Sequence, residues 1–408
     1  MTSSLLIFHY GQSNADCHDA GPSFDAPCLR DPRIVVPNDG AGFRGLFGRP
    51  RKVNITGFEP AFADTPNVQS IGHAAAARYL VDTPDTAFSQ IIVRSGAKGG
   101  RPLCGFVKDA RDIYGIYLGS DGELSPLILD MFEDIHQICT AAKKNGAPVT
   151  HVVIPFFHGE ADRATPRDIY TLILTEMMNV VEAHLAKMDL PVTWMMTQAS
   201  GTGGGYAGNA WENRMSVFDI CDTRANAHFA SANYAYQLMD AAHLNATSKA
   251  LIGEMLGLQI KHALQGTALP ITKLREAAYA GHHIDLTFDS PHGISLATDE
   301  FPTPHTPHGF QIKGHSKQAI TQVEQIGSHQ LRLHCALPVC QSQGELRYAY
   351  FINRKQEYED DTQFPLGRGS LCDDWVTASA IVPGRRVLRW APGFALPLSK
   401  LAQNALAA

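Results

Sequence analysis

The sequence of 408 residues lacks the features of membrane and exported proteins. No apolar stretch approaches the roughly 18 residues that a bilayer span requires. The first apolar run, at positions 5–10, is too short for a signal peptide and has no basic leader. The sequence therefore predicts a chain with neither a membrane span nor an export signal.

Positive charge is also sparse. The 34 Lys and Arg residues are outnumbered by 40 Asp and Glu residues, the formal charge is -6, and the basic residues form no block. Nucleic acids and anionic membrane surfaces attract basic patches, so neither is expected as a partner. A neutral or weakly charged substrate fits this composition better.

The cysteines do not form a recognisable framework. There are eight, and they include no C-x-x-C pair and no dense cluster. This pattern favours reduced, mostly buried thiols. Two pairings stay open as alternatives, Cys17 with Cys28 and Cys335 with Cys340.

The apolar patterns that are present predict an α/β domain followed by a β-rich one. Over about the first 265 residues, β-like runs (5–9, 88–94, 150–156 and 192–197) alternate with helical patterns (68–81, 125–144, 167–187 and 246–263). This alternation is typical of a parallel sheet covered by helices. Beyond Leu274 the runs become short and alternating, as in β-rich structure. We therefore divide the chain into residues 1–270 and a smaller β-rich domain at 280–408.

The first expected strand ends on Gly11-Gln12-Ser13-Asn14. Ligands of α/β folds bind where parallel strands end, so polar residues at these exits are candidate site residues. A serine exposed at a sharp strand-to-helix turn can act as a nucleophile where backbone N–H groups hold an oxyanion. Ser and Asn are, however, also ordinary turn and helix-cap residues.

The second strand exit, residues 93–100, is rich in glycine. Such a loop can lend a backbone N–H to an oxyanion hole. It can also cradle a phosphate, because Arg94 and Lys98 flank it, although it lacks the residue order of a P-loop. A plain flexible loop is the third interpretation.

Two later segments add ionisable groups. His158-Gly159-Glu160-Ala161-Asp162 follows the third strand, where its polar groups face a crevice or cap the next helix. Asp240-Ala241-Ala242-His243 precedes the last helix of the first domain. An Asp and a His three residues apart can point the same way, so that the carboxylate orients the imidazole and supplies a general base.

Taken together and in this order, the segments resemble the SGNH/GDSL hydrolase superfamily, and within it the sialate O-acetylesterase and acetylxylan esterase branch. The matches are GQSN at 11–14, HGEAD at 158–162 and DAAH at 240–243, with the glycine-rich loop at 95–100 in the place of the second block. LRYAYF at 346–351 and GRGSLCDDW at 367–375 look like the β-rich ending of some bacterial and phage-encoded members. The resemblance implies a flavodoxin-like, three-layer α/β/α domain with a parallel sheet, followed by a smaller sandwich-like β-rich domain.

The resemblance also implies roles for matching residues. Ser13 would be the nucleophile, His243 its base, and Asp240 the residue that fixes the imidazole tautomer. The expected oxyanion hole consists of the Ser13 amide, Gly96 or a neighbouring glycine, and His158. The expected substrate pocket comprises Gln12, Asn14, Glu160 and Asp162. Tyr206 and Trp211 are added to it because the glycine-rich loop at 201–211 leaves the fourth expected strand on the same side, where aromatic rings can stack on a sugar; a plain connecting loop is the alternative.

His158 departs from the pattern of the branch, which has a glutamine at that position. A neutral imidazole can donate one hydrogen bond, but its charge depends on pH. Loss of one oxyanion donor typically costs about 10²–10³ in rate. The substitution therefore leaves open either an esterase with an extra ionisation or a scaffold that binds sugars without cleaving them.

The function implied is that of a carbohydrate O-acetylesterase, a serine esterase that needs no metal or other cofactor and acts on an acetylated carbohydrate or polysaccharide. The first rival is a polysaccharide-binding protein of a phage-like particle that retains the scaffold. The second is a lipase or thioesterase of the same superfamily. With no signal peptide, we expect the chain in the cytoplasm or on a phage-like particle, where the β-rich domain could mediate homo-oligomer or particle assembly.

Overall fold

The fold was examined in a computed structural model. It describes residues 2–17, 21–42, 54–64, 68–200, 211–240, 242–267, 269–298, 307–313, 319–339, 344–350 and 369–403. Within these ranges, none of the helices combines the length and the hydropathy that a membrane crossing requires.

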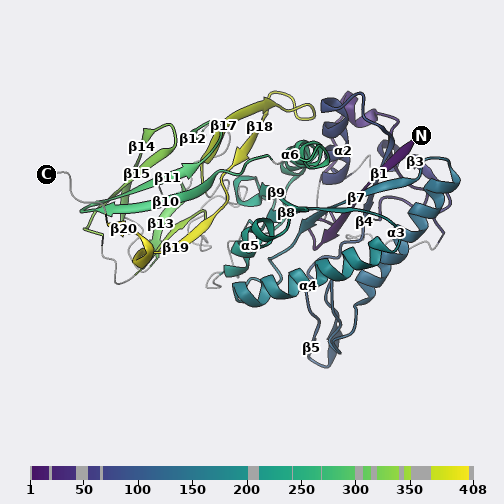
Figure 1. Ribbon diagram of the computed structural model, residues 1–408, viewed down its shortest axis with the longest axis horizontal. Coiled ribbons are helices and arrows are strands. Elements are labelled where there is room, and N and C mark those ends of the chain that lie inside the picture. Colours follow the sequence, from purple (N-terminus) through teal and green to yellow (C-terminus); the bar gives the residue numbers. More distant parts are fainter. Residues whose placement is uncertain are drawn as a thin grey trace.

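A seven-stranded sheet forms the centre of the first domain (Figure 1). Its order is β3-β2-β4-β1-β7-β8-β9, and all neighbours are parallel except β3, which runs antiparallel to β2. The central strands are continuous Val, Ile, Leu and Phe runs, because a parallel sheet is buried on both faces. The bounds are β1 Ser3–Gly11, β2 Ile34–Pro37, β3 Phe58–Pro60, β4 Phe88–Ser95, β7 Val149–Phe157, β8 Val192–Gln198 and β9 Ala227–Ala232.

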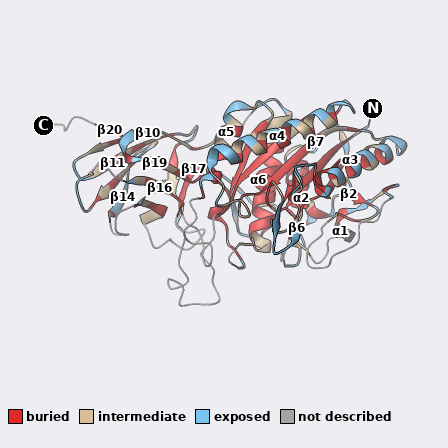
Figure 2. Ribbon diagram, turned by 90° about the horizontal axis from the view of Figure 1, so that it is seen from below, coloured by how far each residue is buried: buried red, intermediate tan, exposed pale blue. Residues whose placement is uncertain are grey.

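Helices cover both faces of this sheet. Figure 1 shows α2 and α6 on one side and α3, α4 and α5 on the other. Figure 2 shows that α2 and α6 are largely buried, whereas α3 and α4 turn one side to solvent. Side-chain caps start three of them, from Ser70, Ser125 and Asn245. The bounds are α1 Ala61–Asp64, α2 Ile71–Asp82, α3 Pro126–Lys144, α4 Arg167–Ala186, α5 Ser216–Thr223 and α6 Ala246–Leu264.

Small residues allow α2 and α6 to pack closely. A Cβ at Gly253 would lie 2.4 Å from the Ala74 Cβ, and one at Gly257 would lie 2.5 Å from the Ala75 carbonyl oxygen. Both distances are too short for a real side chain, so only glycine permits this helix spacing. The packing places the start of α6, and with it the preceding residues, at a fixed position over the sheet.

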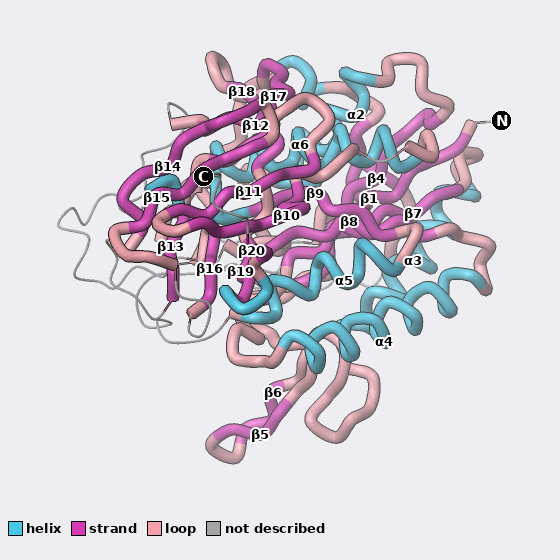
Figure 3. The backbone as a smooth tube through the Cα atoms, turned by 60° about the vertical axis from the view of Figure 1, so that its left-hand side comes forward, coloured by secondary structure: helices cyan, strands magenta, loops and turns pink. Residues whose placement is uncertain are grey.

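The second domain consists of three sheets, with the orders β14-β15-β11-β10-β20, β12-β17-β18 and β13-β16-β19 (Figure 3). Several of their strands alternate between buried and more exposed side chains, as in β11, where Ile284, Leu286 and Phe288 are buried. The bounds are β10 Lys273–Ala280, β11 His283–Asp289, β12 Ile294–Leu296, β13 Phe310–Lys313, β14 Ile320–Gly327, β15 Gln330–Cys335, β16 Glu345–Tyr348, β17 Leu371–Ala378, β18 Arg386–Trp390, β19 Phe394–Pro397 and β20 Ala402–Gln403. A separate hairpin in the first domain, β5 Phe106–Lys108 with β6 Arg111–Ile113, projects from the body (Figures 1 and 3).

Buried hydrogen bonds join the two domains. The Gln198 side chain, at the end of β8, donates to the Gly393 carbonyl over 2.9 Å and accepts from the Gly393 amide over 2.7 Å. The Arg214 guanidinium donates to the Ala349 carbonyl over 2.8 Å. The β-rich domain is therefore packed against the first domain at the end of β8 and at the segment that follows it.

The predicted fold class is confirmed: an α/β domain with a mainly parallel sheet is followed by a β-rich domain. The four predicted strands and four predicted helices of the first domain match β1, β4, β7, β8 and α2, α3, α4, α6 to within about three residues. The sequence analysis missed β2, β9 and α5. β2 has only four residues and ends on Pro37, and β9 consists largely of small residues, so neither gives a strong apolar pattern.

All seven cysteines in the described part of the chain are free, in agreement with the expected reduced state. Cys17 and Cys28 are not paired, and Cys335 is free as well. Cys340 lies outside the described residues.

Two buried histidines are expected to make the fold sensitive to acid. Burial lowers the pKa of His9 from 6.5 to about 3 and that of His73 to about 4. Because these folded-state values are below the unfolded one, the unfolded chain binds more protons once the pH falls below 6.5, and stability is lost from there downward. We expect each histidine to cost about 2 kcal/mol of unfolding free energy at pH 5 relative to pH 8.

Urea unfolding at pH 8 and pH 5 tests this expectation. The variant His9→Leu removes one of the two groups, so its unfolding free energy should fall by about 2 kcal/mol less than that of the wild type between the two pH values. An equal fall in both proteins would contradict the assignment of this acid sensitivity to His9.

Candidate active site

The predicted nucleophile lies on a tight turn at the end of β1. Gly11 has φ +129°, and a Cβ there would lie 2.1 Å from the Phe157 carbonyl oxygen, so only glycine fits. The Gln12 amide donates to the same carbonyl over 2.9 Å, and the Gln12 carbonyl then accepts from the Ala15 and Asp16 amides. Ser13 is partly exposed at the start of this turn, between buried neighbours.

Asp240 and His243 form the predicted pair. One Asp240 oxygen accepts from the amides of Ala242 and His243 over 2.7 Å each, and the other lies 2.5 Å from His243 Nδ1. Partial burial raises the pKa of Asp240, but these hydrogen bonds outweigh it and lower the pKa to about 2. An ionised carboxylate only accepts, so the proton is on Nδ1 and Nε2 is left as the basic nitrogen.

Asn14 brings the two segments together. Its side-chain amide donates to the Ala242 carbonyl over 3.1 Å, and its side-chain oxygen accepts from the Leu244 amide over 3.1 Å. The two contacts lie on either side of His243 in the sequence, and Asn14 directly follows Ser13. Residues more than 200 positions apart are thereby held next to each other.

The structure of the glycine-rich loop contradicts the expectation that the Gly96 amide is an oxyanion donor. The Gly96 amide donates to the His9 carbonyl over 3.0 Å, so it is not available to an oxyanion. A Cβ at Gly99 would instead lie 3.5 Å from the Ser13 Cβ, which places this neighbouring glycine beside the candidate nucleophile. The loop is anchored there by the Lys98 amide, which donates to the Gly11 carbonyl over 3.2 Å.

The structure removes Arg94 from the phosphate-cradle interpretation of this loop. Arg94 is buried, and its guanidinium lies 2.8 Å from Asp39 and 3.1 Å from Asp134. The Arg94 guanidinium is therefore buried and paired with two carboxylates, so it cannot contact a phosphate at the surface.

His158 does not occupy the expected place in an oxyanion hole. Its side chain is fully buried, with Nδ1 2.8 Å from the Tyr170 hydroxyl and Nε2 3.0 Å from the Arg101 carbonyl oxygen. Both ring nitrogens are thus already used inside the protein. The sequence analysis could not foresee this, because the two partners come from a loop 57 residues before and a helix 12 residues after.

The other predicted pocket residues around this block form a hydrogen-bonded frame. The Gln12 side chain donates to Glu160 over 2.5 Å and accepts from the Ala161 amide over 3.2 Å. Asp162 accepts from the Leu103 amide over 2.8 Å, so it fixes a loop and does not cap α4. Gln12 and Glu160 therefore link the nucleophile turn to the residues after β7.

Trp211 is not placed to stack on a sugar. Its side chain is 1% exposed, packed with Ala199 and Tyr350, and its backbone carbonyl accepts from the Tyr350 hydroxyl over 3.1 Å. Tyr206, the other aromatic residue expected there, lies outside the described residues. Asn213 was missed by the sequence analysis; it donates to the Gly159 carbonyl over 2.8 Å and so positions the backbone after His158.

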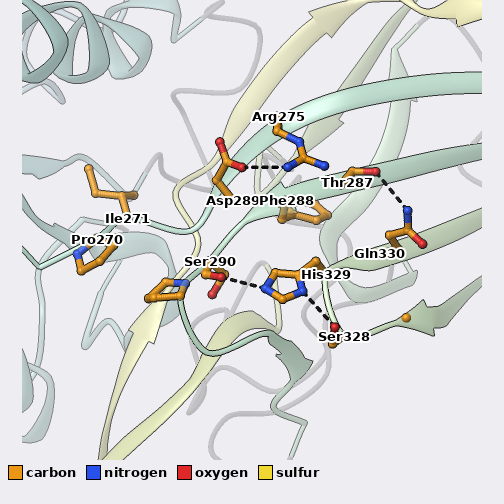
Figure 4. Close-up of a pocket in the computed structure, with 12 residues that line it drawn as sticks. Pro270, Ile271, Arg275, Thr287, Phe288, Asp289, Ser290, Ser328, His329 and Gln330 are labelled. Carbon is orange, nitrogen blue, oxygen red and sulfur yellow. Dashed lines mark hydrogen bonds and ion pairs between the residues drawn. The ribbon is translucent and has the colours of Figure 1, made fainter.

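A pocket of about 670 Å³ lies elsewhere, between the 270–271 segment and the sheet of the β-rich domain (Figure 4). Arg275, Asp289 and His329 are among its lining residues, and none of the predicted site residues is. Among the residues that the structure describes, no group of three or more His, Cys, Asp or Glu side chains is placed to hold a metal ion.

Comparison with known proteins gives matches in structure only. No family model matches the chain, and no curated protein sequence does. A carbohydrate acetylesterase from Xanthomonas citri has a similar structure, with a TM-score of 0.55 at 17% identity over 91% of this chain and 81% of that one. A protein from Arabidopsis thaliana (TM-score 0.41, 15% identity, 63% of this chain and 97% of that one) and NanS (0.40, 14%, 65% and 98%) are also similar. At 17% identity the first similarity shows a shared fold, and its coverage extends over most of this chain.

Proposed function

We propose that this protein is a serine esterase that removes acetyl groups from carbohydrates. The observation that carries the proposal is the bridge from Asn14 to both sides of His243, which holds the Ser13 turn against the Asp240–His243 pair. A nucleophile, a base and a carboxylate that orients the base are the parts that acyl transfer needs.

In the proposed reaction, the Ser13 oxygen attacks the acetyl carbonyl while His243 Nε2 takes the serine proton. The oxyanion that forms is held by backbone amides, of which those of Ser13 and Gly99 are the candidates. The protonated imidazole then gives its proton to the leaving sugar oxygen as the ester bond breaks. Water repeats the sequence on the acetyl-enzyme, releases acetate and restores Ser13.

Carbohydrate is the proposed substrate class on two grounds. The serine lies in the GQSN form that resembles the sugar-esterase branch, and a solved structure with a similar fold is described as a carbohydrate acetylesterase. The net charge of -6 also favours a neutral or weakly charged substrate over a highly anionic one. The proposal assigns the chemistry to residues 1–270 and leaves 280–408 as an accessory domain.

Acyl-chain preference and acetate release test this proposal. We expect turnover of p-nitrophenyl acetate to exceed that of the octanoate by at least about tenfold, and acetate to be released from acetylated xylan or an acetylated sialic acid. Preference for the long chain would indicate a lipase. Binding of the polysaccharide with no acetate release would instead support the particle-bound binding protein.

A further inference from the structure

The contacts of His158 determine where its ring carries a proton. This ring takes no part in the proposed esterase reaction. A carbonyl oxygen can only accept, so the contact between Nε2 and the Arg101 carbonyl requires a proton on Nε2. In the neutral ring, Nδ1 is then the acceptor and the Tyr170 hydroxyl is its donor. The hydrogen bonds therefore select one neutral tautomer.

The same contacts hold the far end of the loop at 96–103. Its first part is fixed by the Gly96 and Lys98 amides, which donate to carbonyls of β1. Its last part is fixed by His158 at the Arg101 carbonyl and by Asp162 at the Leu103 amide. Gly99, which faces Ser13, lies between these two anchors.

We propose that His158 is a positioning residue: its neutral Nε2–H holds the Arg101 carbonyl and thereby keeps the Gly99 amide beside Ser13. This inference rests on the proposed esterase function. A supporting role also accounts for the histidine at position 158, where the branch has glutamine. In this role the side chain holds the loop at 96–103, which carries the candidate donor Gly99, and does not itself donate to the oxyanion.

The surroundings of His158 agree with a neutral ring. Two aromatic rings lie nearly parallel to its ring, those of Phe156 and Tyr170, with centroids 5.7 and 5.9 Å away. Burial lowers its pKa, against the opposing effects of Asp162, whose carboxylate lies 3.6 Å from Nε2, and of the Arg101 carbonyl. At neutral pH the ring is therefore neutral, and both of its hydrogen bonds are formed: one to the Arg101 carbonyl and one from the Tyr170 hydroxyl.

Hydrogen exchange tests whether His158 holds the loop at 96–103, without reference to activity. His158→Leu removes both ring contacts, and we expect the hydrogen-bonded amides of Lys98 and Leu103 to exchange about tenfold faster, the effect of losing one hydrogen bond. Tyr170→Phe, which removes only the donor to Nδ1, should act in the same direction. His158→Gln should recover part of the protection, because its side-chain amide can donate to the Arg101 carbonyl. His136→Gln, at an exposed position of α3, is the matched control and should change nothing.

Kinetics on p-nitrophenyl acetate supply the second measurement. We expect kcat to fall about 10- to 100-fold in His158→Leu with little change in KM, and the Tyr170→Phe effect to vanish in the His158→Leu background, because both act through one contact. A fall in kcat with unchanged exchange at the Lys98 and Leu103 amides would overturn the proposal in favour of a direct oxyanion donor. Faster exchange with unchanged kcat would overturn it as well. If the wild type shows no esterase activity, the proposed function fails, while the exchange result still decides whether His158 holds the loop.

Discussion

Replacing Ser13 with alanine is expected to lower kcat for acetate release by about 10⁴–10⁶-fold, because the acetyl-enzyme cannot form without the serine oxygen. KM should change little. The side chain is partly exposed on a turn that backbone hydrogen bonds hold, so the thermal unfolding midpoint should stay within a few degrees. The measurement is acetate release under saturating substrate.

Ser89→Ala serves as its control. Ser89 is an exposed serine at the amino end of β4, whereas Ser13 follows the carboxyl end of the neighbouring parallel strand β1. The Ser89 hydroxyl donates to the Ser3 carbonyl over 3.1 Å. We expect wild-type kcat from this variant. A Ser13→Ala protein that kept more than a tenth of the wild-type kcat would exclude Ser13 as the nucleophile.

Replacing Asp240 with asparagine is expected to lower kcat by about 10³–10⁴-fold, because it changes the tautomer of the base. The new side-chain oxygen can still accept from the Ala242 and His243 amides, so the loop should keep its shape. Its NH₂ group would then face His243 Nδ1, which favours the ring with the proton on Nε2. That nitrogen could no longer take the proton from Ser13.

The control here is Asp25→Asn, at a surface carboxylate that pairs with Arg30. It should retain wild-type kcat. Because the pKa of Asp240 is about 2, the wild type should also show no loss of kcat from protonation of this carboxylate between pH 5 and pH 8. A change in kcat of less than tenfold in Asp240→Asn would contradict its assignment as the orienting residue.

The parts of the site that could be predicted are those that local sequence determines. The Asp240–His243 contact spans only three residues, and Gly11 marks a turn where β1 meets Phe157. The apolar runs of the sheet also predict which residues lie at strand exits, because a parallel sheet has to be buried on both faces.

The errors share one physical cause. Gly96, His158 and Trp211 were each placed in the site from their position along the chain, yet each has its polar or apolar partners in a distant segment. The Gly96 amide donates to a carbonyl of β1. The His158 ring is hydrogen-bonded to the loop at 96–103 and to α4. The Trp211 side chain packs against Tyr350 of the β-rich domain. Such pairings depend on which segments the fold brings together.

The sequence by itself therefore determined the two-domain order, four strands of the sheet and the residues that carry the proposed chemistry, because periodicity and short motifs express local constraints. Tertiary structure alone decided which glycine adjoins Ser13 and which groups occupy the nitrogens of His158. The physical reason is that a buried polar group has to find a hydrogen-bond partner, and the partner is set by packing between segments far apart in the chain.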